Sequence, residues 1–179
     1  MSKFTFKNGQ TLQMKAMKHS EFASQETHCY KAKLYLDGKL FAYVSNQGYG
    51  GADHQDPADG FTYQDIRDLD QRCKDEMPEW ELLLGQTELD EHYGKTGLEM
   101  WCQNSVNDLL SMQDMKRAMR SKVIYVLPEE PRVVREISWK GCRKIDDRHI
   151  NHVKTKYPNY QLLNTMSVDD AFAIWKGAN

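Results

Sequence analysis

The dipeptide Asp37-Gly38 constrains the fold of this chain more than any other feature of its sequence. It separates two stretches, 30–36 and 39–46, in which apolar and polar residues alternate. Asp-Gly between alternating stretches is the strongest short-range signal for a β-hairpin. The sequence therefore predicts two antiparallel strands here, followed by a glycine-rich loop over residues 47–60.

The register of this hairpin decides which side chains share a face. A two-residue turn sets Leu34 opposite Phe41, whereas a three-residue loop sets Leu34 opposite Leu40. The three-residue loop gives one continuously apolar face, and a slip of one residue would exchange the two faces. We therefore predict the three-residue loop, which places Phe41 on the second face together with Lys31 and Lys33.

Turn and helix-capping signals elsewhere predict an α+β protein. Asn8-Gly9 indicates an opening hairpin that extends the antiparallel sheet to about four N-terminal strands, and a second hairpin is predicted at about 123–139. Strands and helices do not alternate along the chain, which favours α+β over a βαβ arrangement. The three to four helices packed against these strands are expected to begin near Thr62, Thr96, Asp146 or Asp147, and Ser167.

The length of the chain, 179 residues, fits a single domain spanning 1–179. It divides into a sheet with its glycine loop (1–60) and a helical part that contains the second hairpin (61–179). Residues 105–108 are a candidate break in the longest predicted helix, and 79–95 are assigned to neither strand nor helix.

Charge and hydropathy exclude some classes of protein. The formal net charge is −2, which argues against a surface that is basic overall. No apolar stretch approaches the roughly 20 residues needed to span a bilayer, and the first residues lack the apolar centre of an export signal. We therefore expect a cytoplasmic protein without membrane contact and with reduced cysteines. The sequence leaves homo-oligomerisation open.

The loop after the second strand is the main candidate for a ligand site. Glycine lets the backbone approach a ligand closely, and successive backbone amides can form a concave anion site. The spacing differs from the dinucleotide-binding fingerprint and from the P-loop, and a long turn between strand and helix needs glycines for its own geometry. The predicted ligand-binding residues are Asn46, Gly48, Tyr49, Gly50, Gly51, Asp53 and His54.

Part of the same loop is a candidate metal site. Asp53, His54 and Asp56 could hold a divalent metal, since carboxylates and histidine are common ligands. Such residues are also frequent on exposed loops that have no such role. We expect no cofactor, with a divalent metal as the alternative.

Two further groups carry reactive side chains. His149 and His152 lie three residues apart on a predicted helix, after Asp146, and are expected to point to solvent rather than to bind a metal. His28 and Cys29 cannot pair directly, because adjacent residues of a strand face opposite sides. Neither group predicts a catalytic site.

The second face of the predicted hairpin is a candidate surface for nucleic acid or for a protein partner. Aromatic and basic side chains on a sheet can stack on bases and contact phosphates; a helix that covers this face is the alternative. The residues are Lys31, Lys33, Tyr35, Phe41 and Tyr43. Four methionines of the longest helix, either core or an adaptable partner surface, are predicted to be core: Met100, Met112, Met115 and Met119.

The central hairpin and its loop resemble a pattern in small, uncharacterised proteins of tailed phages. The resemblance is carried by residues 26–30, 37–39 and 45–51. It implies a phage-encoded accessory protein that acts in the host cytoplasm. Small phage proteins of this kind often bind and block a host enzyme or a defence factor, or sequester a signalling nucleotide.

No motif in the chain specifies a reaction, and this favours a non-enzymatic binding protein. We predict a phage-encoded protein that inhibits a host or defence factor or sequesters a nucleotide, with the glycine loop and the aromatic–basic face as contact surfaces. Two alternatives remain open. One is a metal-dependent hydrolase or nuclease that uses Asp53, His54 and Asp56, and the other is a nucleic-acid-binding accessory protein.

Overall fold

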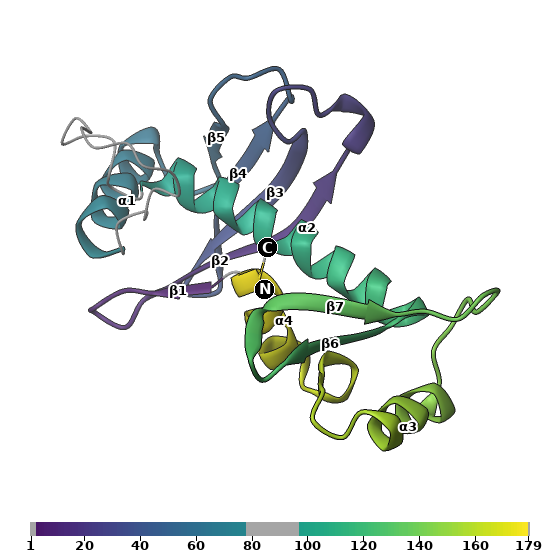
Figure 1. The fold of residues 1–179 in the computed structure, drawn as a ribbon. Helices are drawn as coiled ribbons and strands as arrows, with labels where there is room; N and C mark the ends of the chain where they lie inside the picture. The colour runs from purple at the N-terminus through teal and green to yellow at the C-terminus, as the bar shows by residue number, and fades with distance from the viewer. Residues whose placement is uncertain (1–2, 78–96, 179) are drawn as a thin grey trace, which may run out of the picture. The chain divides into compact units, whose positions relative to one another are not determined.

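The structure is a computed structural model that describes residues 3–77 and 97–178. The fold is α+β, as predicted (Figure 1). The chain packs into two compact units, Met1–Asn107 and Asp108–Asn179. Their boundary lies within one continuous helix, α2 (Leu98–Ser121), so the expected break at 105–108 is wrong. Whether the whole chain forms a single domain stays a prediction.

The first unit is built on a five-stranded antiparallel sheet in which every strand pairs with its neighbours in sequence. The prediction of about four strands missed the last one, which lies in the segment predicted as loop. A short 3-10 helix, η1 (Glu21–Ala23), connects the second strand to the third. The strands are β1 (Lys3–Thr5), β2 (Thr11–His19), β3 (Tyr30–Leu36), β4 (Lys39–Asn46) and β5 (His54–Pro57).

The turn between β3 and β4 has two residues, and the predicted three-residue loop is wrong. Leu36 pairs with Lys39. Asp37 and Gly38 have φ angles of 49° and 78°, and positive φ at both positions is what a type I′ hairpin turn requires. The local Asp-Gly signal therefore decides the turn, although it offsets the strands by one residue from the register that the apolar pattern favours.

A β-bulge in β4 corrects this offset. Tyr35 pairs with Leu40, but Leu34 pairs with Ala42, so Phe41 is the extra residue. Phe41 and Ala42 are both buried, at 2% and 0% exposure. The prediction that Phe41 lies on the open face with the lysines is therefore wrong, because the bulge turns its side chain inward.

The inner face of the sheet forms the core of the first unit together with two helices. Helix α1 (Tyr63–Glu76) begins after Thr62, as predicted, with a capping box in which the side chains of Thr62 and Asp65 each accept from the other's backbone amide. Pro78, Thr96 and 79–95 lie outside the described residues. The buried side chains of the sheet are Leu12, Met14, Tyr30, Ala32, Leu34, Ala42 and Val44, and those of the helices are Ile66, Leu69, Cys73, Leu98, Trp101, Cys102 and Val106.

The second unit contains a three-stranded sheet in the order β7-β6-β8. The predicted hairpin is confirmed, although its second strand begins at Glu130, within residues 128–131, which the sequence predicts as its turn. Asp146 caps helix α3, as expected, and Ser167 Oγ accepts from Asp170 N at the start of helix α4. The elements are β6 (Val123–Leu127), β7 (Glu130–Ile137), α3 (Asp147–Lys156), β8 (Gln161–Leu162), η2 (Leu163–Thr165) and α4 (Val168–Ala178).

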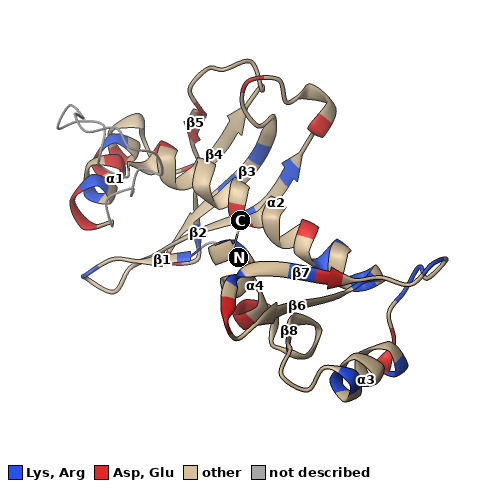
Figure 2. Cartoon of the chain, in the orientation of Figure 1, with Lys and Arg blue, Asp and Glu red and all other residues tan. Residues whose placement is uncertain are grey.

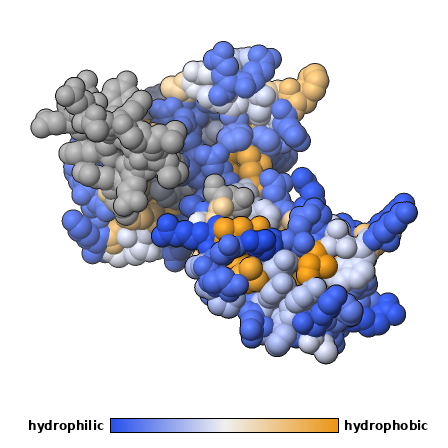
Figure 3. All heavy atoms as spheres, viewed as in Figure 1, coloured by the Kyte–Doolittle hydropathy of each residue, from blue (hydrophilic) through white to orange (hydrophobic). Residues whose placement is uncertain are grey.

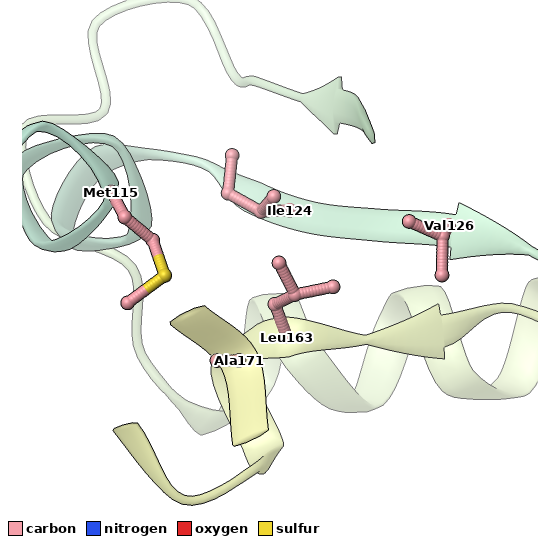
Figure 4. Packing of buried hydrophobic residues seen from close by; sticks show 5 residues of the cluster. All are labelled: Met115, Ile124, Val126, Leu163 and Ala171. Carbon is pink, nitrogen blue, oxygen red and sulfur yellow. The ribbon is translucent and has the colours of Figure 1, made fainter. Parts of the chain in front are cut away.

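The core of the second unit includes one of the predicted methionines. Met115 is fully buried, and Met112 and Met119 pack against the same cluster, whereas Met100, in the first unit, is 36% exposed. Figure 4 shows the buried cluster of Met115, Ile124, Val126, Leu163 and Ala171.

The surface visible in Figure 3 is mostly hydrophilic, with small separate hydrophobic patches among the described residues. Within residues 3–77 and 97–178, no helix combines the length and the apolar character that crossing a membrane requires.

Candidate functional site

The glycine loop is held together by the side chain of Asn46, the last residue of β4, which is only 4% exposed. Its Nδ2 donates to Gly51 O (2.8 Å) and to Asp53 Oδ1 (3.0 Å). Its Oδ1 accepts from Gly48 N (2.8 Å) and from Thr27 Oγ1 (2.8 Å). These four bonds use the full hydrogen-bonding capacity of an amide side chain, so Asn46 shapes the loop and has no group left for a ligand.

The loop amides that could have formed an anion site also donate within the protein. Gly48 N donates to Asn46, and Gly50 N donates to Thr27 Oγ1 (3.3 Å). In the other direction, Gly48 O accepts from the backbone amides of Gln25 (2.9 Å), Glu26 (3.0 Å) and Thr27 (3.4 Å). The structure therefore places Gly48 and Gly50 in the packing of the loop against residues 25–27.

Asp53 is turned toward the core side of the loop. Its Oδ2 accepts from the hydroxyl of Tyr30 (2.5 Å), and its backbone N donates to Glu99 Oε1 (3.0 Å). Burial raises the pKa of the Asp53 carboxyl above its ordinary value; the hydrogen bonds from Tyr30 and Asn46 act in the opposite direction, and the charge of Glu99 adds to the rise. Burial likewise raises the pKa of the Tyr30 phenol.

A cavity of about 430 Å³ lies beside this network, between the η1–β3 connection, the glycine loop and the first part of α2. Two carboxylates, Glu26 and Asp53, lie in its wall, and no lysine or arginine is among its described lining residues. His28 Nε2 and Asn107 Oδ1 are 2.7 Å apart on one side. The lining residues are Ser24, Gln25, Glu26, Thr27, His28, Tyr30, Asn46, Asp53, Gln103, Val106 and Asn107.

The residues of the predicted metal site do not converge. His54 and Asp56 lie two apart on β5 and are exposed, and Asp56 accepts from the hydroxyl of Tyr63 (3.1 Å). Asp53 faces Tyr30 instead. In the part of the chain that the structure describes, no group of three His, Cys, Asp or Glu residues is placed to hold a metal ion, which removes the geometric basis of the hydrolase alternative.

The open face of the sheet carries four of the five residues predicted for it, all except Phe41. Tyr43 is 46% exposed, so no helix among the described residues covers this face at Tyr43, contrary to the alternative. Lys33 Nζ lies 5.8 Å from the centre of the Tyr43 ring, and Lys15 Nζ lies 4.7 Å from that of Tyr35. We call this surface the lysine–tyrosine face and define it as Lys15, Lys18, Lys31, Lys33, Tyr35 and Tyr43.

Lysines face one another across β2 and β3. Lys15 pairs with Lys33, and Lys18 pairs with Lys31; Figure 2 shows basic segments side by side on these strands. Like charges directly opposite in a sheet are destabilising, and none of the four forms an ion pair with another described residue. Sequence reasoning missed Lys15 and Lys18 because residues three apart lie on opposite faces of an ordinary strand. Here a bulge at Ala16 brings both side chains to the same face.

Of His28, His149 and His152, one differs from its predicted surroundings. His149 is partly buried and its Nδ1 lies 2.6 Å from Asp146 Oδ1, so the expectation that it points to solvent is wrong, whereas His152 is exposed. His28 contacts Asn107 and the ring of His19, in agreement with the expectation that it does not pair with Cys29.

Comparison with protein-family models, with curated proteins and with solved structures found no match to this chain.

Proposed function

We propose that this protein acts by binding rather than by catalysis, and that the lysine–tyrosine face binds single-stranded nucleic acid. The observation that carries the proposal is the two pairs of facing lysines, Lys15 with Lys33 and Lys18 with Lys31, on an uncovered sheet face. Repulsion between these ammonium groups costs stability in the free protein. A row of phosphates removes this cost, and this is a reason to expect a polyanion on the surface.

The tyrosines favour a single strand over a duplex. Unpaired bases expose their faces and stack on aromatic side chains, with little dependence on sequence. Tyr43 is exposed, and Tyr35 lies on the same face. The overall charge of −2 does not oppose this, because four lysines gathered on one face create a local positive potential.

The test is the salt dependence of binding to a fluorescent single-stranded oligonucleotide, measured by anisotropy. Four phosphate contacts predict that log K falls with log salt concentration with a slope of about −2.8, or about fiftyfold between 50 and 200 mM salt. The variant Lys31→Gln/Lys33→Gln removes two contacts and should reduce the slope to about −1.4.

The matched control is Lys7→Gln/Lys39→Gln, which removes two exposed lysines of the same unit that lie outside this face: Lys7 follows β1 beside Glu76, and Lys39 pairs with Leu36 on the other side of the sheet from Tyr35. It should bind as the parent does. Equal weakening by both double variants would mean that only total charge matters, and the lysine–tyrosine face would then not be the binding surface. Lack of any salt-dependent binding by the parent protein would refute the proposal.

The cavity beside the glycine loop supports a second candidate, the sequestration of a small ligand. Glu26 and Asp53 in its wall favour a ligand that presents amino groups or other donors, whereas a phosphate would meet two carboxylates. A nucleotide would therefore have to enter with its base. Native mass spectrometry with nucleosides and small amines tests this: Glu26→Gln should weaken retention, and equal retention of the ligand by this variant would exclude the cavity. The inhibition of a host or defence factor, and the phage origin, rest on the resemblance alone.

A further inference from the structure

A thiol, an imidazole and a carboxylate lie in a row next to the start of α3 in the second unit. Cys142 Sγ is 3.7 Å from His149 Nε2, and His149 Nδ1 is 2.6 Å from Asp146 Oδ1. The ring of Trp139 packs edge-on against His149, with ring centres 4.8 Å apart. This order of nucleophile, base and orienting acid is the geometric signature of an activated nucleophile.

The capping of α3 explains the contact between His149 and Asp146 but not the contact between His149 and Cys142. Asp146 is the N-cap residue, and Asp146 N lies 3.4 Å from His149 Nδ1, a contact that completes a capping box only when Nδ1 is unprotonated; Nδ1 lies closer, at 2.6 Å, to Asp146 Oδ1. The short contact to Asp146 is satisfied when Nδ1 carries the proton and donates to the carboxylate. Nε2 is then free to accept a proton, and it lies 3.7 Å from Cys142 Sγ, whose thiol can donate either to Nε2 or to Lys144 O, 3.2 Å from the sulfur.

The surroundings of Cys142 argue for one kind of partner. Residues 132–156 contain eight Lys and Arg against three Asp and Glu, and basic segments mark α3 and the chain that leads to it in Figure 2. The neighbouring cations Lys140, Arg143 and Lys144 are exposed and form no ion pair with other described residues. This favours an anionic reactant.

Acyl transfer fits the site poorly. It needs preorganised donors for a developing oxyanion, commonly backbone amides beside the nucleophile. Cys142 N already donates to Trp139 O (3.0 Å). Thiol–disulfide exchange needs no such donor, because the charge that develops lies on the leaving sulfur.

We propose that Cys142 is a reactive thiol that exchanges with small anionic disulfides. Cys142 Sγ attacks one sulfur of the disulfide as its proton passes to His149 Nε2. A new S–S bond forms between Cys142 and one half of the disulfide, and the old S–S bond breaks. The other half leaves as a thiolate and takes the proton from His149, so Cys142 is oxidised while the leaving half is reduced to a thiol. Asp146 is a positioning residue that holds the imidazole.

The test is the reaction of the full chain with oxidised glutathione at pH 7, followed by intact mass and peptide mapping so that each cysteine has its own rate. Cys29 is an internal control, because it is also partly buried but has no imidazole at its sulfur among the described residues. Cys142 should form the mixed disulfide faster than Cys29. Equal or slower reaction at Cys142 would overturn the proposal.

The variant His149→Gln isolates the base. An ordinary thiol is a few per cent thiolate at pH 7, so a base can raise the reactive fraction at most about thirtyfold, and the lower nucleophilicity of a stabilised thiolate reduces the gain to about tenfold. We expect His149→Gln to slow Cys142 about tenfold without changing Cys29. His152→Gln, on the same helix but away from the thiol, should leave both rates unchanged. An unchanged rate in His149→Gln would refute the role of the imidazole.

Two further measurements test the positioning role of Asp146, separately from its role as N-cap, and the preference for an anionic disulfide. Asn is as good an N-cap as Asp, so Asp146→Asn should keep α3 but slow Cys142, since a neutral amide no longer fixes the tautomer with Nδ1 protonated. The preference for oxidised glutathione over the neutral disulfide of 2-mercaptoethanol should shrink at high salt. An unchanged rate in Asp146→Asn would exclude the positioning role, and a preference that does not depend on salt would exclude the anionic one.

Discussion

The replacement of Gly48 by alanine tests whether the glycine loop is shaped by its own packing. A Cβ atom at this position would lie 2.2 Å from Ala23 O and 3.0 Å from Cys29 Cβ. The first of these is a backbone atom, so it cannot swing away as the end of a long side chain can. Gly48 also has a φ of +90°, and the left-handed region costs an L-residue about 1–2 kcal/mol.

The steric contact adds to this strain. To relieve it, the loop must move away from residues 23–29, which breaks the bonds from the amides of Gln25, Glu26 and Thr27 to Gly48 O. The net value of each bond is about 1 kcal/mol. Strain and the loss of two or three bonds together predict that Gly48→Ala lowers the free energy of unfolding by about 3–5 kcal/mol.

Two neighbouring glycines provide matched controls. Gly50 has a φ of +86°, and its added Cβ would lie 2.1 Å from Glu26 Oε2, which can rotate away, and 3.3 Å from Glu26 Cβ, a contact that a shift of a few tenths of an ångström relieves. Gly50→Ala should therefore cost only the backbone strain, about 1–2 kcal/mol. Gly51 has nothing within 4 Å of the added atom, so Gly51→Ala should change stability by less than about 0.5 kcal/mol.

The assay is urea unfolding of the three variants and the parent, with the slope of each transition checked for a change in the denatured state. The order Gly48, Gly50, Gly51 is the result that supports the packing account. Equally small changes in the free energy of unfolding for Gly48→Ala and Gly51→Ala would refute it. The loop would then tolerate a side chain at Gly48, and its backbone would again be a candidate for ligand binding.

Three further changes test other parts of the first unit. Ala16→Gly should raise the free energy of unfolding by about 0.5–1 kcal/mol, because Ala16 is exposed with a φ of +53° and relief of that strain exceeds the entropy cost of glycine. Lys33→Gln should stabilise the free protein by about 0.2–1 kcal/mol at low salt by removing repulsion from Lys15, and the gain should disappear at high salt. Burial raises the pKa of the Asp53 carboxyl, so ionisation of Asp53 costs stability as pH rises above the ordinary value of 3.8. In urea unfolding, the free energy of unfolding of the parent should fall relative to that of Asp53→Asn as pH rises from this value to the raised pKa of folded Asp53. Above that pKa, the difference between the two proteins should stay constant.

The elements of the fold that sequence predicts well are those whose signals act within a few residues. Thr62 and Asp65 form the capping box of α1 three residues apart, and Asp146 caps α3 in the same way. The Asp37-Gly38 turn is equally local. In each case the donor and acceptor groups that create the structure are adjacent in sequence, so the pattern and the physical cause coincide.

The faces of the sheet are harder to predict because bulges change them. One extra residue at Phe41 returns the apolar side chains of β4 to the core after a turn that had displaced them. The bulge near Ala16 likewise brings Lys18 opposite Lys31. A bulge has no dependable local pattern: here it follows from the competition between turn geometry, which is local, and burial, which depends on the whole sheet.

The loop shows why glycines and amides alone cannot identify a ligand site. The same backbone N–H groups can serve an anion or the protein, and the choice depends on side chains that the loop pattern does not reveal, here Asn46, two residues before Gly48, and Thr27, 23 residues before Gly50. Once these donors are engaged, what remains for a ligand is side-chain chemistry: two carboxylates at the cavity and four lysines on the open face. The two surfaces attract opposite charges, so an anionic ligand whose binding to the lysines weakens with salt should not bind at the cavity carboxylates, and a cationic ligand should do the reverse. The variant Lys31→Gln/Lys33→Gln should therefore weaken the binding of an oligonucleotide but not of a small amine, and Glu26→Gln should do the reverse. If either variant weakened the binding of both ligands, charge distribution would not govern recognition in this unit.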